Sequence, residues 1–174
     1  MIVQHGMKRM YEDQEDVFFY LTLMNENYAH PDMPMGVEDE IIKGLYRFKE
    51  VKKPSKKHVT LMGSGTILVQ AMKAAEMLGA DFGVTSEIWS ATSFNELARD
   101  CQDVARHNRL NPLAEPKVSF VAQQLAKAKG PGLAATAYMT NFAEQIRTGV
   151  PGSYTGWVQN RIGRCRSPGY PPRP

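Results

Sequence analysis

The pattern of apolar positions changes period within residues 57–81, KHVTLMGSGTILVQAMKAAEMLGAD, and the rest of the chain is arranged around this stretch. The alternating, β-branched run His58–Met62 predicts one buried strand. The segment Gly63–Gly65 follows, and its two glycines allow a sharp turn. Apolar residues then recur at helical spacing until Gly79, where we expect the helix to end. A strand, a glycine turn and a helix in this order predict half of a βαβ unit, and therefore a parallel sheet.

Two interpretations of the glycine turn are open, a phosphate cradle at a helix N-terminus and a plain tight turn. A dinucleotide-binding loop needs a third glycine at the position of Leu68, and a nucleotide-hydrolase loop needs a Gly-Lys-Ser/Thr sequence that this turn lacks. Ser64 is also outside the G-x-S-x-G setting of a hydrolase. We therefore interpret the turn as architectural.

Upstream of this unit, the chain begins with helical turns over Ile2–Met10 and continues into a nearly unbroken apolar run, Val17–Leu23. That run predicts a strand buried on both faces. The polar cluster 25–28 (Asn-Glu-Asn-Tyr) follows at the carboxyl end of this strand, where ligands bind in α/β sheets. Ordinary turn chemistry of the asparagines is the alternative interpretation.

Downstream, Val118–Ala122 fits a strand or the start of a helix equally well. A capping box at Ser93 and Glu96 predicts the start of a helix that ends near Asn111. The other predicted elements are a short amphipathic piece inside a proline-containing linker, a strand, a second strand and a final helix: Glu38–Lys49, Glu87–Ala91, Leu133–Tyr138 and Met139–Thr148.

Composition places the chain among ordinary soluble proteins, with 174 residues, 43% hydrophobic and 22% charged. No apolar run approaches the roughly 18–20 residues that span a bilayer. Met1–Arg9 lacks the layout of a signal peptide, and Cys101 and Cys165 lie far apart without metal-ligand spacing. These features predict a cytoplasmic protein without a membrane partner.

The net charge of +3 comes from four arginines in residues 153–174, a Pro/Gly/Arg-rich stretch without acidic residues. The rest of the chain has 17 basic and 18 acidic residues. A nucleic-acid-binding protein concentrates basic residues on a folded face, often together with aromatic residues. We therefore expect residues 153–174 to be a disordered tail, and we expect no nucleic-acid partner.

No catalytic constellation is present in the sequence. The histidines share no metal-ligand spacing with each other or with a cysteine or carboxylate: His5, His30, His58 and His107. The charged side chains between Arg99 and His107 are typical of a solvated helix face. We assign no catalytic, cofactor-binding or metal-binding residue.

Four strings carry a family resemblance: HGMKRMYEDQEDVFFYLTLMNENYAHPDMPMG, LMGSGTIL, ADFGVTSEIWSATSFNELARD and ATAYMTNFAEQIRTGVP. Over residues 2–152 the chain resembles the homodimeric type of pyruvate dehydrogenase, the decarboxylating first component of its complex. The resemblance implies thiamine diphosphate and Mg²⁺ as cofactors, pyruvate as substrate, and a dihydrolipoyl acetyltransferase as the partner whose lipoyl group is acetylated. It also implies a transketolase-like, three-domain α/β layout in a homodimer.

Under this resemblance the fold class is α/β, a transketolase C-terminal-domain-like sheet with flanking helices, preceded by a remnant of the pyrimidine-binding domain. Residues 1–30 would be that remnant, 31–56 a linker, 57–152 an incomplete C-terminal-like domain, and 153–174 a tail outside the family pattern. The family's catalytic and cofactor-binding residues lie upstream of Met1. We therefore expect this fragment to bind no cofactor and to be inactive, with subunit association as its main role.

The sequence departs from the family pattern at Ala137, where an acidic residue is usual, and near Cys101, where a glycine is usual. After Gly152 the family continues with a strand, a G-T-D-G-F-G-R-S-D-like loop and a last αβ unit, but this chain reads SYTGWVQNRIGRCRSPGYPPRP. We hypothesise a frameshifted or truncated gene. The expected consequences are an unpaired sheet edge and an exposed, aggregation-prone segment Val17–Leu23.

Three functional hypotheses follow. The first is a fragment of the thiamine-dependent dehydrogenase. The second is a free-standing, non-catalytic association module with the same domain surface. The third is an unrelated nucleotide-binding domain built on the glycine turn, which the missing third glycine disfavours.

Overall fold

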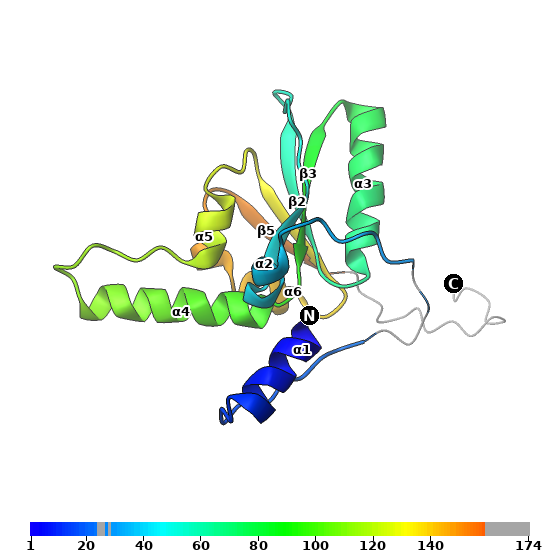
Figure 1. Ribbon diagram of the computed structural model, residues 1–174. Helices are drawn as coiled ribbons and strands as arrows, with labels where there is room; N and C mark the ends of the chain where they lie inside the picture. The colour runs from blue at the N-terminus through cyan, green and yellow to red at the C-terminus, as the bar shows by residue number, and fades with distance from the viewer. Residues whose placement is uncertain (24–26, 28, 159–174) are drawn as a thin grey trace, which may run out of the picture.

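The computed structural model describes residues 1–23, 27 and 29–158, and its centre is a five-stranded sheet in the order β1-β3-β2-β4-β5 (Figure 1). Neighbouring strands from β3 to β5 are parallel, while β1 runs antiparallel to β3. The strands are Leu45–Lys49 (β1), His58–Gly63 (β2), Thr85–Ala91 (β3), Gly132–Thr136 (β4) and Tyr154–Val158 (β5). The predicted α/β class, a transketolase C-terminal-like sheet with flanking helices, is confirmed.

Helices cover both faces of the sheet, α3 on one face and α4, α5 and α6 on the other (Figure 1). A separate helical piece, α1 with a following π-helical turn η1, packs near α2. The helices are Ile2–Met7 (α1), Lys8–Glu12 (η1), Glu38–Lys43 (α2), Ile67–Phe82 (α3), Phe94–Leu110 (α4), Phe120–Leu125 (α5) and Thr140–Glu144 (α6), with a 3₁₀ turn at Arg147–Gly149 (η2).

The main core lies between the sheet and the helices α4, α5 and α6. Phe94 and Leu97 of α4 are fully buried against Met62 of β2 and Trp89 of β3. The ring of Phe94 meets that of Phe142 edge-to-face, with centroids 5.6 Å apart, a favourable aromatic arrangement. The alternating apolar positions of the strands therefore fix which face carries these helices.

The predicted unit of strand, turn and helix is present as β2 and α3, but α3 ends later than predicted. Gly79 lies inside the helix, and the helix ends at Gly83, which has a φ of 63°. The N–H of Gly83 donates to the carbonyl of Gly79, and that of Val84 donates to Leu78. The left-handed conformation at Gly83 closes the helix, so the prediction of Gly79 as the last residue is wrong.

The predicted capping box of α4 is present, with the N–H of Glu96 donating to Ser93 Oγ at 3.2 Å. The helix ends at Leu110, next to the predicted Asn111. The ambiguous stretch Val118–Ala122 resolves as the helix α5, which buries Val121 completely.

The linker predicted over residues 31–56 contributes a strand to the sheet. The amphipathic piece is helical only as far as Lys43, because Gly44 has a φ of 104° and ends α2. A Cβ at Gly44 would lie 2.6 Å from the carbonyl oxygen of Ser93, so this close approach requires glycine. The chain then continues as β1, whose Leu45 is fully buried. The interpretation of this stretch as a linker alone is therefore wrong.

The apolar run Val17–Leu23 forms no strand in the described part of the chain. Phe18 and Leu23 are almost fully exposed, whereas Phe19 packs against Gly6 and lies 6.1 Å, ring to ring, from His5. A strand needs a hydrogen-bonding neighbour, which this segment lacks here. The prediction of a buried strand is wrong for this chain, and the expected exposure is confirmed. The polar cluster after it, 25–28, lies outside the described residues except for Asn27.

The tail predicted to be disordered over residues 153–174 begins with the strand β5, which pairs with β4 from Tyr154 to Val158. The Tyr154 hydroxyl donates to the carbonyl of Ala143 at 2.7 Å, and burial raises the pKa of this hydroxyl. The carboxylate of Glu144 accepts from the N–H of Gly156 at 2.6 Å and pairs with Arg147 at 2.5 Å. These contacts fix β5 against α6. The prediction of disorder is therefore wrong for residues 154–158, and the rest of the predicted tail, 159–174, lies outside the described residues. Among the described strands, β5 is the edge of the sheet on this side.

Candidate functional site

The carboxyl ends of β2 and β4 are the expected place for a ligand. The chain passes from β2 through α3 to β3 on one side, while β4 lies on the other side of β2, so the strand order reverses between β2 and β4. Open α/β sheets bind ligands in the crevice at such a reversal. In this chain Ser64, Thr136 and Tyr138 lie at or just after the carboxyl ends of these two strands.

The polar groups at these strand ends are hydrogen-bonded to one another. The N–H of Ser64 donates to the carbonyl of Ala135 at 3.2 Å, and its hydroxyl donates to Thr136 Oγ1 at 3.3 Å. The N–H of Tyr138 donates to the same Thr136 hydroxyl at 3.3 Å. These contacts join the ends of β2 and β4, which is a structural task.

The glycine turn is explained by close packing. A Cβ at Gly63 would lie 2.6 Å from the Cα of Leu68, so the first turn of α3 can approach the end of β2 only when no side chain intervenes. Leu68, at the position of the missing third glycine, is buried in the interior. The residues of this turn do not fit a diphosphate cradle, and the packing supports the architectural interpretation.

The histidines lie apart in the structure. His5 packs on Phe19, His58 Nδ1 lies 2.8 Å from the Thr85 hydroxyl, and His107 is near Asn111. His30 is exposed. Within residues 1–23, 27 and 29–158, no group of three or more His, Cys, Asp and Glu side chains is arranged to hold a metal ion.

Two other polar groups in the interior also have structural partners. The carboxylate of Glu87 accepts a hydrogen bond from Thr60 Oγ1 at 2.8 Å. Burial raises the pKa of the Cys101 thiol, which keeps it protonated and unreactive beside Ser119. Neither group lines either of the two hollows described next.

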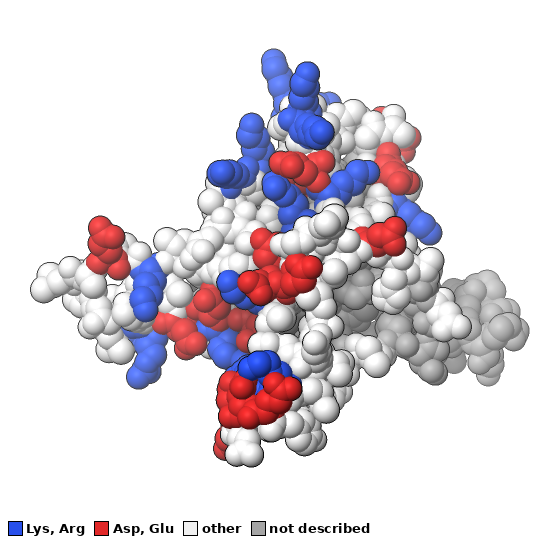
Figure 2. All heavy atoms as spheres, viewed as in Figure 1, with Lys and Arg blue, Asp and Glu red and all other residues white. Residues whose placement is uncertain are grey.

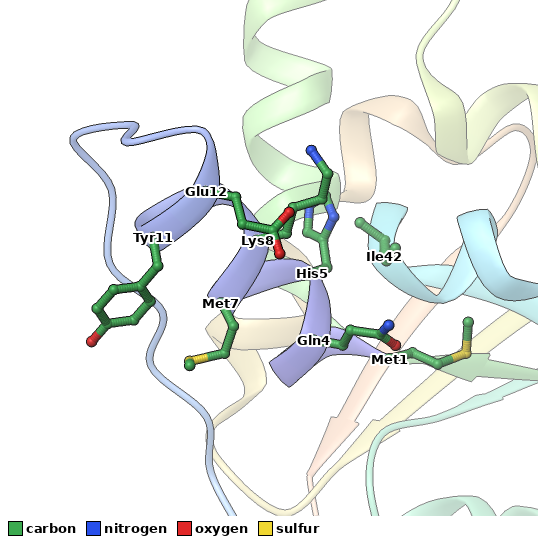
Figure 3. Close-up of a pocket in the computed structure, with 8 residues that line it drawn as sticks. All are labelled: Met1, Gln4, His5, Met7, Lys8, Tyr11, Glu12 and Ile42. Atoms are coloured by element: carbon green, nitrogen blue, oxygen red, sulfur yellow. The ribbon is translucent and has the colours of Figure 1, made fainter.

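A hollow of about 460 Å³ lies between α1, η1 and Ile42 of α2 (Figure 3). Met7 and Tyr11 point away from Ile42 of α2, so the walls do not converge on one point (Figure 3). The ammonium of Lys8 pairs with Asp13 at 2.7 Å, which raises the pKa of Lys8. A smaller hollow of about 300 Å³ is lined by Lys43, Glu96, Asp100, Phe120 and Gln123. Neither hollow contains a set of residues suited to catalysis.

Comparison with known proteins supplies the family. A family model described as the transketolase-like TK C-terminal domain matches residues 44–159. The chain belongs to the transketolase-like C-terminal domain family. A second model, the middle domain of the pyruvate dehydrogenase E1 component, matches residues 1–31.

Similar proteins are named pyruvate dehydrogenase E1 component. This transketolase-like chain is 48% identical over 165 residues to the protein of Cupriavidus necator, covering 94% of this chain and 18% of that protein. It is 50% identical over 151 residues to the Pseudomonas aeruginosa protein and 49% identical over 152 residues to the Escherichia coli K12 protein, covering 87% of this chain and 17% of each. The family prediction is confirmed, and the chain spans less than a fifth of the length of these relatives.

The matched C-terminal domain range includes β1 and β5, the two strands that the predicted range 57–152 leaves outside. Both are short edge strands. The prediction missed them because β1 lies inside a lysine-rich stretch and β5 inside an arginine-rich stretch, and the composition of each stretch is typical of a linker or tail. No helix in the described part of the chain has the length and apolar content needed to cross a membrane.

Proposed function

We propose that this chain is a C-terminal portion of a pyruvate dehydrogenase E1 component. The complete enzyme would use thiamine diphosphate and Mg²⁺ to decarboxylate pyruvate and to acetylate the lipoyl group of a dihydrolipoyl acetyltransferase. One observation carries the proposal. The middle-domain match at residues 1–31 and the C-terminal-domain match at 44–159 follow each other along the chain, with 48–50% identity to proteins of that name.

The role of the portion itself is subunit association in a homodimer. Its polar groups at the carboxyl end of the sheet hydrogen-bond to each other, so they are not free to bind a ligand. Contact with another subunit is the remaining role for this end of the sheet. Large apolar side chains are exposed near this end, with Tyr138 at 58%, Met139 at 59% and Trp157 at 52%. Tyr138 is held in place by stacking on Phe142, with ring centroids 5.3 Å apart. Rigid aromatic side chains of this kind are enriched at protein interfaces.

The assignment of residues 1–30 to a remnant of the preceding domain remains a proposal for how the portion maps onto the complete enzyme. The proposed C-terminal-like unit is widened from residues 57–152 so that it includes β1 and β5. The cytoplasm is the compartment that fits it, because Cys101, the cysteine in the described part of the chain, is a buried free thiol. Neither a membrane nor a nucleic acid is a proposed partner.

We expect the isolated chain to bind no thiamine diphosphate. Titrating the cofactor and Mg²⁺ into the purified 174-residue protein should give only heats of dilution in a calorimeter. The polar groups at the ends of β2 and β4 bond to one another, and within residues 1–23, 27 and 29–158 no group of three or more His, Cys, Asp and Glu side chains is arranged for a metal ion. The Escherichia coli pyruvate dehydrogenase E1 component is the positive control. Saturable heat from the isolated chain would contradict the proposal that this portion serves subunit association and binds no cofactor by itself.

A free-standing association module is the second candidate function. The contacts of Tyr154, Glu144 and Arg147 favour it, since they fix β5 against α6 as the fifth strand of the sheet. Sedimentation velocity separates the candidates. A stable folded dimer at micromolar concentration supports the module, and a monomer or an aggregate supports the portion of a larger enzyme.

A further inference from the structure

Lysine side chains gather at the amino end of the parallel strands. Figure 2 shows basic side chains concentrated over the part of the molecule where Figure 1 draws the loop before β2. All of these lysines are exposed, and together they are here named the amino-edge lysine patch: Lys49, Lys52, Lys53, Lys56, Lys57, Lys127 and Lys129.

Strand pairing brings three separate stretches of sequence together at this edge. Lys49, the last residue of β1, pairs with Ile88 in the middle of β3, and since the two strands are antiparallel the chain after Lys49 runs toward the amino end of β3. The carbonyl of Lys57 accepts from the N–H of Thr85 at 3.0 Å, at the start of the same strand. The loop before β4 lies against the start of β2, because the N–H of Thr60 donates to the carbonyl of Pro131 at 2.9 Å. Lys127 and Lys129 lie in the segment that joins α5 to β4 and contains this loop.

The positive charge of the patch is not neutralised within the described part of the chain. The ion pairs found there include none with these seven lysines. The nearby carboxylate of Glu50 pairs with Arg47 at 3.2 Å, and that of Glu87 is buried and bonded to Thr60. Uncompensated like charges repel one another and favour an anionic partner.

We propose that the amino-edge lysine patch docks an acidic segment of another protein. Lysine presents a hydrated point charge on a flexible stem, which suits carboxylates at variable positions more than the bidentate recognition of bases or phosphates that arginine provides. Phe82, which is 65% exposed, lies near the patch, because the Ser55 hydroxyl donates to the carbonyl of the adjacent Gly83 at 3.4 Å. A single ring is less than the series of aromatic side chains on which successive bases stack, or the apolar face that inserts into a membrane. Charge complementarity of this type steers association and depends on salt. This surface is separate from the carboxyl end of the sheet, and it is independent of the proposed dehydrogenase role.

Fluorescence anisotropy with labelled poly-L-glutamate tests this assignment on the complete 174-residue chain. We expect saturable binding at low salt that weakens as salt rises, since exposed charges are screened beyond about 10 Å at 0.1 M ionic strength. The variant K52Q/K53Q/K56Q/K57Q should bind about tenfold more weakly or worse. A second variant, K127Q/K129Q, should also lose affinity, because the loop before β4 contributes to the same surface.

The matched control is R161Q/R164Q/R166Q/R173Q, which also removes four positive charges, from the C-terminal arginines. It should bind poly-L-glutamate almost as well as the unchanged chain. An equal loss in the control would show attraction by net charge alone and would overturn the assignment, as would absence of binding at low salt. Tighter binding of duplex DNA or of phosphatidylserine vesicles to the same lysines would also overturn it, in favour of those partners. Circular dichroism verifies that each variant is folded.

Discussion

Phe94→Ala is expected to lower the free energy of unfolding by about 3–5 kcal/mol, the usual cost of removing a fully buried aromatic ring. Phe94 has no solvent exposure and is the first residue of α4. Its ring packs edge-to-face on Phe142, so the substitution removes both the buried area and a favourable aromatic contact. The cavity would lie where α4 and α6 meet the sheet.

Urea denaturation followed by tryptophan fluorescence measures this effect, because Trp89 belongs to the same core cluster as Phe94. Phe82→Ala is the control, since Phe82 at the end of α3 is 65% exposed. It removes the same atoms from a helical position and should change the midpoint little. Equal losses for the two substitutions would mean that the core does not lie where the structure places it.

Gly130→Ala is expected to destabilise the fold by about 3 kcal/mol or more, because two costs combine. Gly130 has a φ of 75°, which disfavours any side chain. A Cβ there would also lie 2.0 Å from the carbonyl oxygen of His58, a backbone atom that cannot move without disturbing β2. The loop before β4 would have to move away from the start of β2.

Gly36→Ala separates the two costs. Gly36 has nearly the same φ, 76°, but nothing lies within 4 Å of the position of its Cβ. Only the conformational cost of about 1 kcal/mol applies to it. Thermal unfolding of both variants gives the comparison, and a Gly130→Ala variant as stable as Gly36→Ala would rule out the close approach of the two segments.

Local patterns in the sequence predicted the helices and strands whose formation depends on residues close together in the chain. The β-branched run of β2 and the Ser93 capping box have short-range physical causes, and both appear in the structure. The edge strands do not have such causes. β1 depends on Gly44 turning the chain against Ser93, and β5 depends on Tyr154 reaching Ala143, contacts that only the folded chain creates. The composition of a whole linker or tail does not reveal a strand of five residues within it, which is the length of both β1 and β5.

The candidate site shows the same division. The missing third glycine at Leu68 favours an architectural turn before α3, and the packing there agrees with this interpretation, because a Cβ on Gly63 would lie 2.6 Å from the Cα of Leu68. The lysine patch was not predicted, because its members lie in three stretches up to 80 residues apart, Lys49 to Lys129. Strand pairing alone brings them together. Whether Val17–Leu23 forms a strand likewise depends on a neighbouring strand to pair with, and the segment has none in the described part of the chain.

A hybrid enzyme tests the family assignment most directly. The 152 residues of the Escherichia coli pyruvate dehydrogenase E1 component that align with this chain would be replaced by the matching residues of this chain. We expect the hybrid to dimerise and to retain thiamine diphosphate-dependent decarboxylation of pyruvate, and the same hybrid with Gly130→Ala to lose both. A folded, dimeric hybrid that binds the cofactor but does not turn over pyruvate would contradict the assignment of this chain to a working pyruvate dehydrogenase.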